Sequence, residues 1–231
     1  MQHLVIRATN VFSENGTGGD AVLGVSHVMA MSSIRRQLDD IVSQLPEDQK
    51  SNFLVWHHYH MVLIRLYEPI IDMKSLDPTN KTFMRSQALW TCCQSAKSLL
   101  ELYLTIPGDM FAALSFVMVA HLSYSNIVLT HLLFLEDRDW DAHIARESIN
   151  YPDLAERLSD YFVACEQLLG RRCKVMEDGK GLFTRSAERM RWAKSWYLSK
   201  LPIDSSILGT AATAPVVANE MEYETWQILF A

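Results

Sequence analysis

Three histidines and two tyrosines interrupt an apolar stretch, LVWHHYHMVLIRLYEPI, that runs from residue 54 to residue 70. Imidazole binds metals, transfers protons and forms hydrogen bonds, so this stretch is the first candidate for chemistry. On a helix, His57 and His60 lie on an apolar face, whereas His58 lies on a narrow polar stripe with Arg65. The pattern therefore predicts that two of the three histidines point into the protein core.

Two histidines three residues apart are able to hold one edge of a metal ion, which makes a helical metalloenzyme using His57 and His60 one hypothesis. The sequence has neither the H-E-x-x-H glutamate nor the E-x-x-H pair of di-iron bundles. Further ligands would have to come from other helices, from Glu101, His121 or His131. Core histidines with hydrogen-bonded neighbours are the favoured interpretation, and we expect no metal site.

Other catalytic signatures are absent from the sequence. It contains no G-x-S-x-G nucleophile elbow, and its G-T-G-G stretch lacks the Lys-Ser/Thr ending of a phosphate loop. The four cysteines include no C-x-x-C pair, so they are interpreted as reduced, buried residues of an intracellular protein. We therefore expect no enzyme activity and no cofactor.

The overall charge argues against nucleic acid as a direct partner. The 231 residues carry a net charge of −6, and phosphate binding needs clustered lysine and arginine. A basic run between residues 185 and 200 is interleaved with aromatic residues, but Glu188 interrupts it. That run is interpreted as a solvated helix face backed by core aromatics.

Helical periodicity, separated by proline and glycine, dominates the chain and predicts an all-α protein. We expect one bundle of about six or seven helices around a central uncharged helix. The domain boundaries predicted are a flexible segment over residues 1–25, a helical domain over 26–202, and a linker with a C-terminal helix over 203–231. The predicted helices are, in order, 26–45, 47–67, 81–106, 109–135, 152–170, 182–200 and 219–230.

The central uncharged helix has no Asp, Glu, Lys or Arg between Met110 and Leu135. It is long enough to span a bilayer, but its internal polar residues and acidic flanks favour a buried helix, so no membrane span is expected. Its buried polar groups need partners inside the bundle or a ligand in a cavity. The candidate ligand-binding residues are Met118, His121, Ser125 and Asn126, with His60 opposite.

The C-terminal stretch NEMEYETWQILFA mixes three glutamates with large apolar residues. Such segments fold onto a partner's groove in some activation domains, and in other proteins they pack as a terminal helix on their own body. Packing is slightly favoured because the aromatic residues would otherwise be exposed. The candidate partner-binding residues are Tyr223, Trp226, Leu229 and Phe230.

Four successive segments carry short motifs in a fixed order. These are Ile34, Leu38, Ile41 and Leu45-Pro46; then Tyr59-His60, Leu63, Leu66 and Pro69; then Cys93, Ala96, Leu99 and Leu100; then Phe116, Ala120 and Leu122. In order and spacing they resemble the regulatory (middle homology) region of fungal zinc-cluster transcription factors, over about residues 26–200. The zinc cluster itself needs six closely spaced cysteines, so the resemblance is to the regulatory portion without the DNA-binding domain.

The resemblance implies a nuclear transcription regulator, able to shuttle with the cytoplasm, whose helical domain senses a small hydrophobic effector such as a sterol. It also implies control of an activation segment, with the transcription machinery or co-regulator proteins as partners. Eleven methionines are compatible with an adaptable ligand pocket, although irregular helix packing would use them equally well. The alternative is a ligand-free interaction module, such as one that forms a homodimer.

Overall fold

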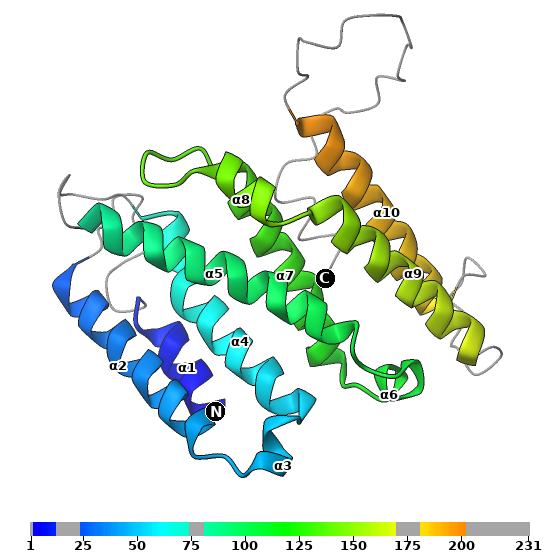
Figure 1. Ribbon diagram of the computed structural model, residues 1–231, viewed down its shortest axis with the longest axis horizontal. Helices are drawn as coiled ribbons and strands as arrows, with labels where there is room; N and C mark the ends of the chain where they lie inside the picture. Colours follow the sequence, from blue (N-terminus) through cyan, green and yellow to red (C-terminus); the bar gives the residue numbers. More distant parts are fainter. Residues whose placement is uncertain (1, 13–23, 74–80, 170–180, 202–231) are drawn as a thin grey trace, which may run out of the picture. The chain divides into compact units, whose positions relative to one another are not determined.

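The computed structural model describes residues 2–12, 24–73, 81–169 and 181–201, and in these ranges the chain is helical without β-strands (Figure 1). The predicted all-α class is confirmed. The described ranges hold ten α-helices, more than the six or seven expected, and one 3-10 helix, η1. Their bounds are α1 Gln2–Asn10, α2 Val25–Ser43, α3 Glu47–Lys50, α4 Phe53–Tyr67, η1 Glu68–Ile71, α5 Lys81–Tyr103, α6 Gly108–Ala112, α7 Phe116–Phe134, α8 Ala142–Ser148, α9 Tyr151–Leu169 and α10 Leu182–Lys200.

The chain divides into two compact units, where the sequence predicted one bundle. The first comprises Met1–Ile106 and Phe116–Ile149, and the second comprises Pro107–Ser115 and Asn150–Ala231. The first unit therefore contains α1 to α5, α7 and α8, and the second contains α6, α9 and α10.

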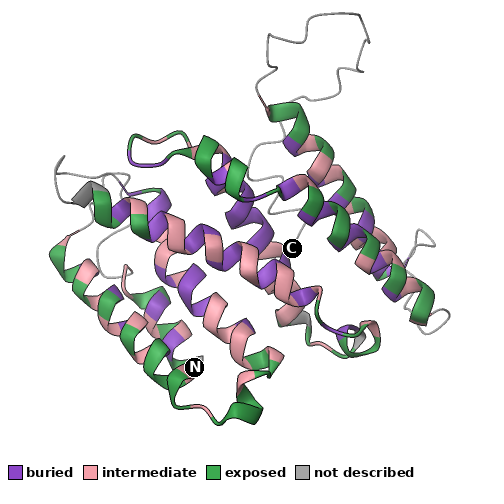
Figure 2. Cartoon of the chain, viewed as in Figure 1, coloured by how far each residue is buried: buried purple, intermediate pink, exposed green. Residues whose placement is uncertain are grey.

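The core of the first unit forms where α4 packs against α5 and α5 packs against α7. Figure 2 shows buried residues concentrated along these three helices. Helix α4 is apolar on most of its circumference, so it needs neighbours on several sides, and α1 also packs on it. The core side chains from these helices include Val62, Ile64, Leu66, Leu89, Leu99, Leu100, Leu129 and Leu132, all fully buried.

The predicted helix over residues 47–67 is divided in two. Its first turn is the short helix α3, and α4 begins again after Asn52. The Asn52 side chain accepts a hydrogen bond from the backbone N–H of Leu54 at 2.9 Å, which is the geometry of an N-cap. Helix α4 ends at Tyr67, and Pro69 lies in the following 3-10 turn, close to the predicted stop.

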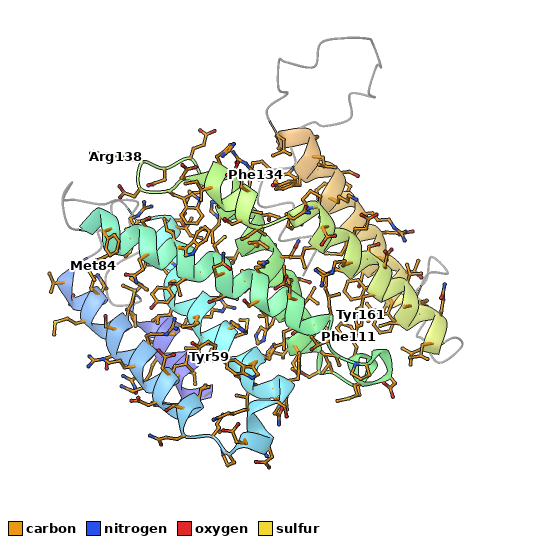
Figure 3. The ribbon with its side chains drawn as sticks, in the orientation of Figure 1. Tyr59, Met84, Phe111, Phe134, Arg138 and Tyr161 are labelled. Atoms are coloured by element: carbon orange, nitrogen blue, oxygen red, sulfur yellow. The ribbon has the colours of Figure 1, made fainter. Side chains whose placement is uncertain are left out.

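The predicted helix over residues 109–135 is also divided, at residues 113–115. Its first part is α6, which packs against α9 in the second unit through Phe111. The Phe111 ring lies 5.7 Å from the Phe162 ring and 5.6 Å from the Tyr161 ring (Figure 3). Its second part is α7, in the first unit. The absence of charge predicted one helix, but packing of the two parts into different units requires the break.

By length and composition alone, Val117–Phe134 of α7 is apolar enough to cross a membrane. Half of this window is buried inside the protein. A buried core helix satisfies the same criteria, so this observation is weak evidence for a span.

Two further helices correct the sequence-based expectation. Residues 1–25 were predicted to be a flexible segment, but Gln2–Asn10 forms α1, because Leu4 and Ala8 share one face and are buried. Helix α8 was not predicted. It is capped by Asp141, whose carboxylate accepts hydrogen bonds from the N–H groups of His143 and Ile144 at 2.9 and 3.1 Å.

The second unit is built mainly from α9 and α10, which pack together. The rings of Tyr151 and Tyr197 lie 4.9 Å apart, and Lys194 pairs with Glu156 at 2.9 Å. The bounds of α10 agree with the predicted helix over residues 182–200.

Candidate functional site

His57 is the most enclosed histidine of the cluster on α4. Its side chain is 1% exposed, and its ring stacks on that of His121 from α7 with the centroids 5.2 Å apart. Nε2 of His57 lies 3.4 Å from Nδ1 of His121. The rings of Phe53 and Tyr103 complete the enclosure at 5.7 and 5.8 Å from the His57 ring. The structure thus joins two histidines that lie 64 residues apart in the sequence.

The other two histidines of the cluster are only half-buried. His60 contacts Trp56 and Tyr59 of its own helix, with ring centroids 6.3 and 5.4 Å away. His58 forms a hydrogen bond between its Nδ1 and the carbonyl oxygen of Leu54 at 2.7 Å. The prediction that His57 faces the core is confirmed, while His60 and His58 both lie at intermediate depth.

Burial favours the neutral form of His57, His60 and His121. It lowers the pKa of His57 from the ordinary 6.5 to about 3, because a charged ring would lose its water and repel His121, His58 and His60. Burial, with repulsion from Arg35, lowers the pKa of His60 to about 4. Burial also lowers the pKa of His121, with repulsion from Arg65 as the second cause. At pH 7 each of these neutral rings has one N–H donor and one acceptor nitrogen.

The candidate residues on α7 are used mainly for internal packing. The Tyr103 hydroxyl donates to the backbone carbonyl of Met118, and the Ser125 hydroxyl donates to the carbonyl of His121 at 2.7 Å. Asn126 is fully buried, and its backbone carbonyl accepts from the Thr130 hydroxyl at 2.9 Å. In the described ranges, Nδ1 of His57 and Nδ1 of His60 have no hydrogen-bond partner.

A metal centre finds no support in the described part of the chain, where no three His, Cys, Asp or Glu side chains are grouped to hold an ion. The predicted partner-binding residues Tyr223, Trp226, Leu229 and Phe230 lie outside the described residues. The same is true of the predicted linker and terminal helix.

Arg85 on α5 is a buried charge that the sequence analysis missed. It is 1% exposed, pairs with Asp137, and lies 3.7 Å from Asp139. Its Nε donates to the carbonyl of Met73 at 3.0 Å, and its Nη2 reaches the carbonyls of residues 70 and 71. The sequence pattern does indicate that Arg85 is buried, because Arg85 shares a helical face with Leu89, Cys92 and Ala96. These partners make it a structural anchor for the loop after α7.

A groove of about 450 Å³ runs between α2, the end of α4 and the first half of α5. Met84, labelled in Figure 3, lies on the α5 side of this groove. Its lining combines apolar, neutral polar and basic side chains, and it contains no carboxylate. The lining residues are Val28, Met31, Ser32, Arg35, Arg36, Tyr67, Met84, Gln87, Ala88 and Thr91.

A hydrogen-bonded cluster holds Arg35 at one wall of this groove. Its Nε donates to both carboxylate oxygens of Asp39, at 2.8 and 3.1 Å, and its Nη2 donates to the Tyr59 hydroxyl at 3.0 Å. The Tyr59 hydroxyl in turn donates to Asp39 at 3.0 Å. Burial raises the pKa of Tyr67, so its hydroxyl stays protonated beside the same groove.

Two other clefts lie in the first unit. The larger, of about 770 Å³, is formed by Phe83, Ser86 and the loop over residues 135–142, where Glu136, Asp137, Asp139 and Asp141 make it acidic. A smaller one of about 430 Å³ lies between α1 and α2. None of these three clefts is lined by the candidate residues His60, Met118, His121, Ser125 and Asn126.

Comparison with known proteins places the chain in a family. A family model described as the ATEG07667_C C-terminal domain matches residues 109–227, just over half of the 231 residues. The chain is also 22% identical, over 199 residues, to the transcription factor opdL of Penicillium oxalicum. That alignment covers 86% of this chain and 34% of opdL, so the chain spans about a third of the length of this curated relative.

No solved structure matches the chain. The two sequence matches confirm the resemblance to the regulatory region of a fungal transcription factor. The chain belongs to the ATEG07667_C C-terminal domain family.

Proposed function

We propose that this chain is the effector-sensing regulatory region of a fungal transcription regulator that acts in the nucleus and shuttles with the cytoplasm. The similarity to opdL is the observation that carries this proposal. The role is non-enzymatic, and control of transcription passes through the transcription machinery or co-regulator proteins. The acidic and aromatic residues Tyr223, Trp226, Leu229 and Phe230 are the proposed partner contacts.

The proposed signal is a small, largely apolar molecule, for which a sterol is the reference compound. An effector that binds one packing of the helices more tightly than another shifts their populations and so changes the exposure of partner-binding residues. The groove between α2, α4 and α5 supports this proposal, because about 450 Å³ is within the usual range for small-molecule sites.

A second proposed place for the effector is the set formed by His60, Met118, His121, Ser125 and Asn126. The observation in its favour is the pair of Nδ1 atoms, on His57 and His60, that have no hydrogen-bond partner within the described residues. A ligand with a polar group would satisfy them, because buried polar atoms are otherwise almost always paired.

A reporter assay tests the sensing role. The chain is fused to an unrelated DNA-binding domain in a fungal host, and reporter output is measured with and without a panel of sterols and other lipophiles. We expect at least one compound to change the output and to raise the thermal midpoint of the purified chain. The proposal is wrong if no compound in the panel changes either readout.

A ligand-free interaction module is the second candidate function. It is favoured by large apolar side chains exposed on α1 and α2, namely Ile6, Val25 and Met29, each more than 60% exposed. Light scattering distinguishes the two, because self-association through these residues gives a mass that rises with protein concentration and falls in Met29→Glu. A concentration-independent monomer mass would contradict a homodimer.

A further inference from the structure

The groove between α2, α4 and α5 differs in charge from the rest of this acidic protein. The whole chain carries a net charge of −6, yet the ten residues that line the groove include two arginines and no aspartate or glutamate. An arginine without a carboxylate partner in such a lining attracts an anion. The groove therefore has the electrostatic character of an anion-binding site.

The two arginines have different roles. Asp39 pairs with Arg35 and neutralises its charge, and the Tyr59 hydroxyl accepts a hydrogen bond from its guanidinium. Arg35 is therefore part of the groove wall but offers no uncompensated charge to a ligand. Arg36 is exposed, and its one hydrogen bond within the described residues is a weak one from Nε to the carbonyl of Ser32 at 3.4 Å. Among the described residues no carboxylate pairs with Arg36. Its guanidinium is thus the charge available to a ligand.

The other residues that line the groove indicate which chemical groups the ligand has besides an anionic end. Met31 and Ala88 are nearly fully buried, and Met84 is 40% exposed. Methionine side chains adapt to apolar bodies of different shapes. The hydroxyls of Ser32, Tyr67 and Thr91 add neutral hydrogen-bonding groups along the same surface. An apolar body and one anionic end would satisfy both parts of the lining.

We propose that the groove binds an amphipathic organic acid, with its carboxylate on Arg36 and its apolar body against Met31, Met84 and Ala88. This rests on the proposed effector-sensing function and narrows the effector from an apolar molecule to a lipophilic carboxylate. A guanidinium is well suited to this ligand, because its planar donors match the two carboxylate oxygens.

Binding is tested with matched pairs of compounds that differ in the carboxylate. The probes are naphthoate against naphthol and decanoate against decanol, titrated into the full chain at neutral pH by calorimetry. Because Arg36 is exposed, solvent screens its pairing with a carboxylate, and the gain in affinity is about fivefold. We expect each acid to bind more tightly than its alcohol by about that factor.

The variant Arg36→Gln removes the charge from an exposed helical position, so the fold should be retained. It should weaken binding of the acids by about fivefold and leave the alcohols unchanged. Arg191→Gln is the matched control, because Arg191 is also exposed and helical but belongs to α10 in the other unit. It should leave the affinity for both acids and alcohols unchanged.

Methyl labelling of methionine locates the bound probe by NMR. We expect the ε-methyl signals of Met31 and Met84 to shift with naphthoate, while those of Met118 and Met190 stay in place. If the Met118 signal shifts and those of Met31 and Met84 do not, the ligand occupies the α4–α7 set and the groove proposal is wrong. The sensing role would then still stand.

The other outcomes also separate the two proposals. Equal affinities for acids and alcohols, or an Arg36→Gln variant that binds acids like the unmodified chain, overturn the carboxylate assignment. If no probe binds but a sterol raises the thermal midpoint, the assignment is wrong and effector sensing is retained. If no probe or sterol binds and the reporter does not respond, both proposals are wrong.

Discussion

Replacing His57 by phenylalanine should flatten the pH dependence of unfolding on the acidic side of neutrality. The folded protein holds His57 neutral against His121, with its pKa lowered to about 3 by burial and by the neighbouring histidines. In the unfolded chain the ring is protonated near its ordinary pKa of 6.5. Protons therefore bind the unfolded state more strongly between these two values, and stability is lost as the pH falls from 6.5 toward 3.

The magnitude follows from the two pKa values. A single group that titrates at 6.5 when unfolded and at about 3 when folded makes the protein about 2 kcal/mol less stable at pH 5 than at pH 8. The burial of His57, which is 1% exposed, means that little of this is screened by solvent. Phenylalanine keeps an aromatic ring between Phe53, Tyr103 and His121 but binds no proton.

The assay is urea denaturation of the unmodified chain and of His57→Phe at pH 8 and at pH 5. The loss of stability between the two pH values should be smaller in His57→Phe by about 2 kcal/mol. Leu54→Ala is the control, because Leu54 lies at an exposed position and carries no titratable group, so it should leave the pH dependence unchanged. A His57→Phe variant that loses as much stability as the unmodified chain would refute the buried-neutral account of His57.

Three further predictions test the fold. Arg85→Met should destabilise the first unit by about 3 to 5 kcal/mol in urea denaturation, because it leaves Asp137 and Asp139 without their cation; a loss under about 1 kcal/mol contradicts this. Leu66→Ala should lower the free energy of unfolding by about 2 to 5 kcal/mol in the same measurement, because Leu66 is fully buried. Leu54→Ala, at an exposed position, should lower it far less. Similar losses in the two variants would contradict the placement of Leu66 in the core. Asn52→Ala should cost about 1 kcal/mol through loss of the α4 cap, and Asn52→Asp should restore it; an unchanged stability in the alanine variant argues against capping.

The sequence by itself determined the helical class and several helix bounds. Periodic apolar residues and well-placed prolines mark α5 and α10 because these signals act locally, within a few turns of one helix. The same local reasoning placed His57 on the buried face of α4. The local features that the sequence did not predict are the cap at Asn52 and the short helices α1 and α8. Each depends on weak signals over few residues.

Only the tertiary structure decided which residues meet. The contact between His57 and His121, the pairing of Arg85 with Asp137, and the groove at Arg36 each join segments far apart in the chain. The break between α6 and α7 belongs to the same class, because an uncharged run fits one long helix equally well until its two parts pack in different units. Periodicity states which face of a helix is apolar, but it contains no information about which partner covers that face.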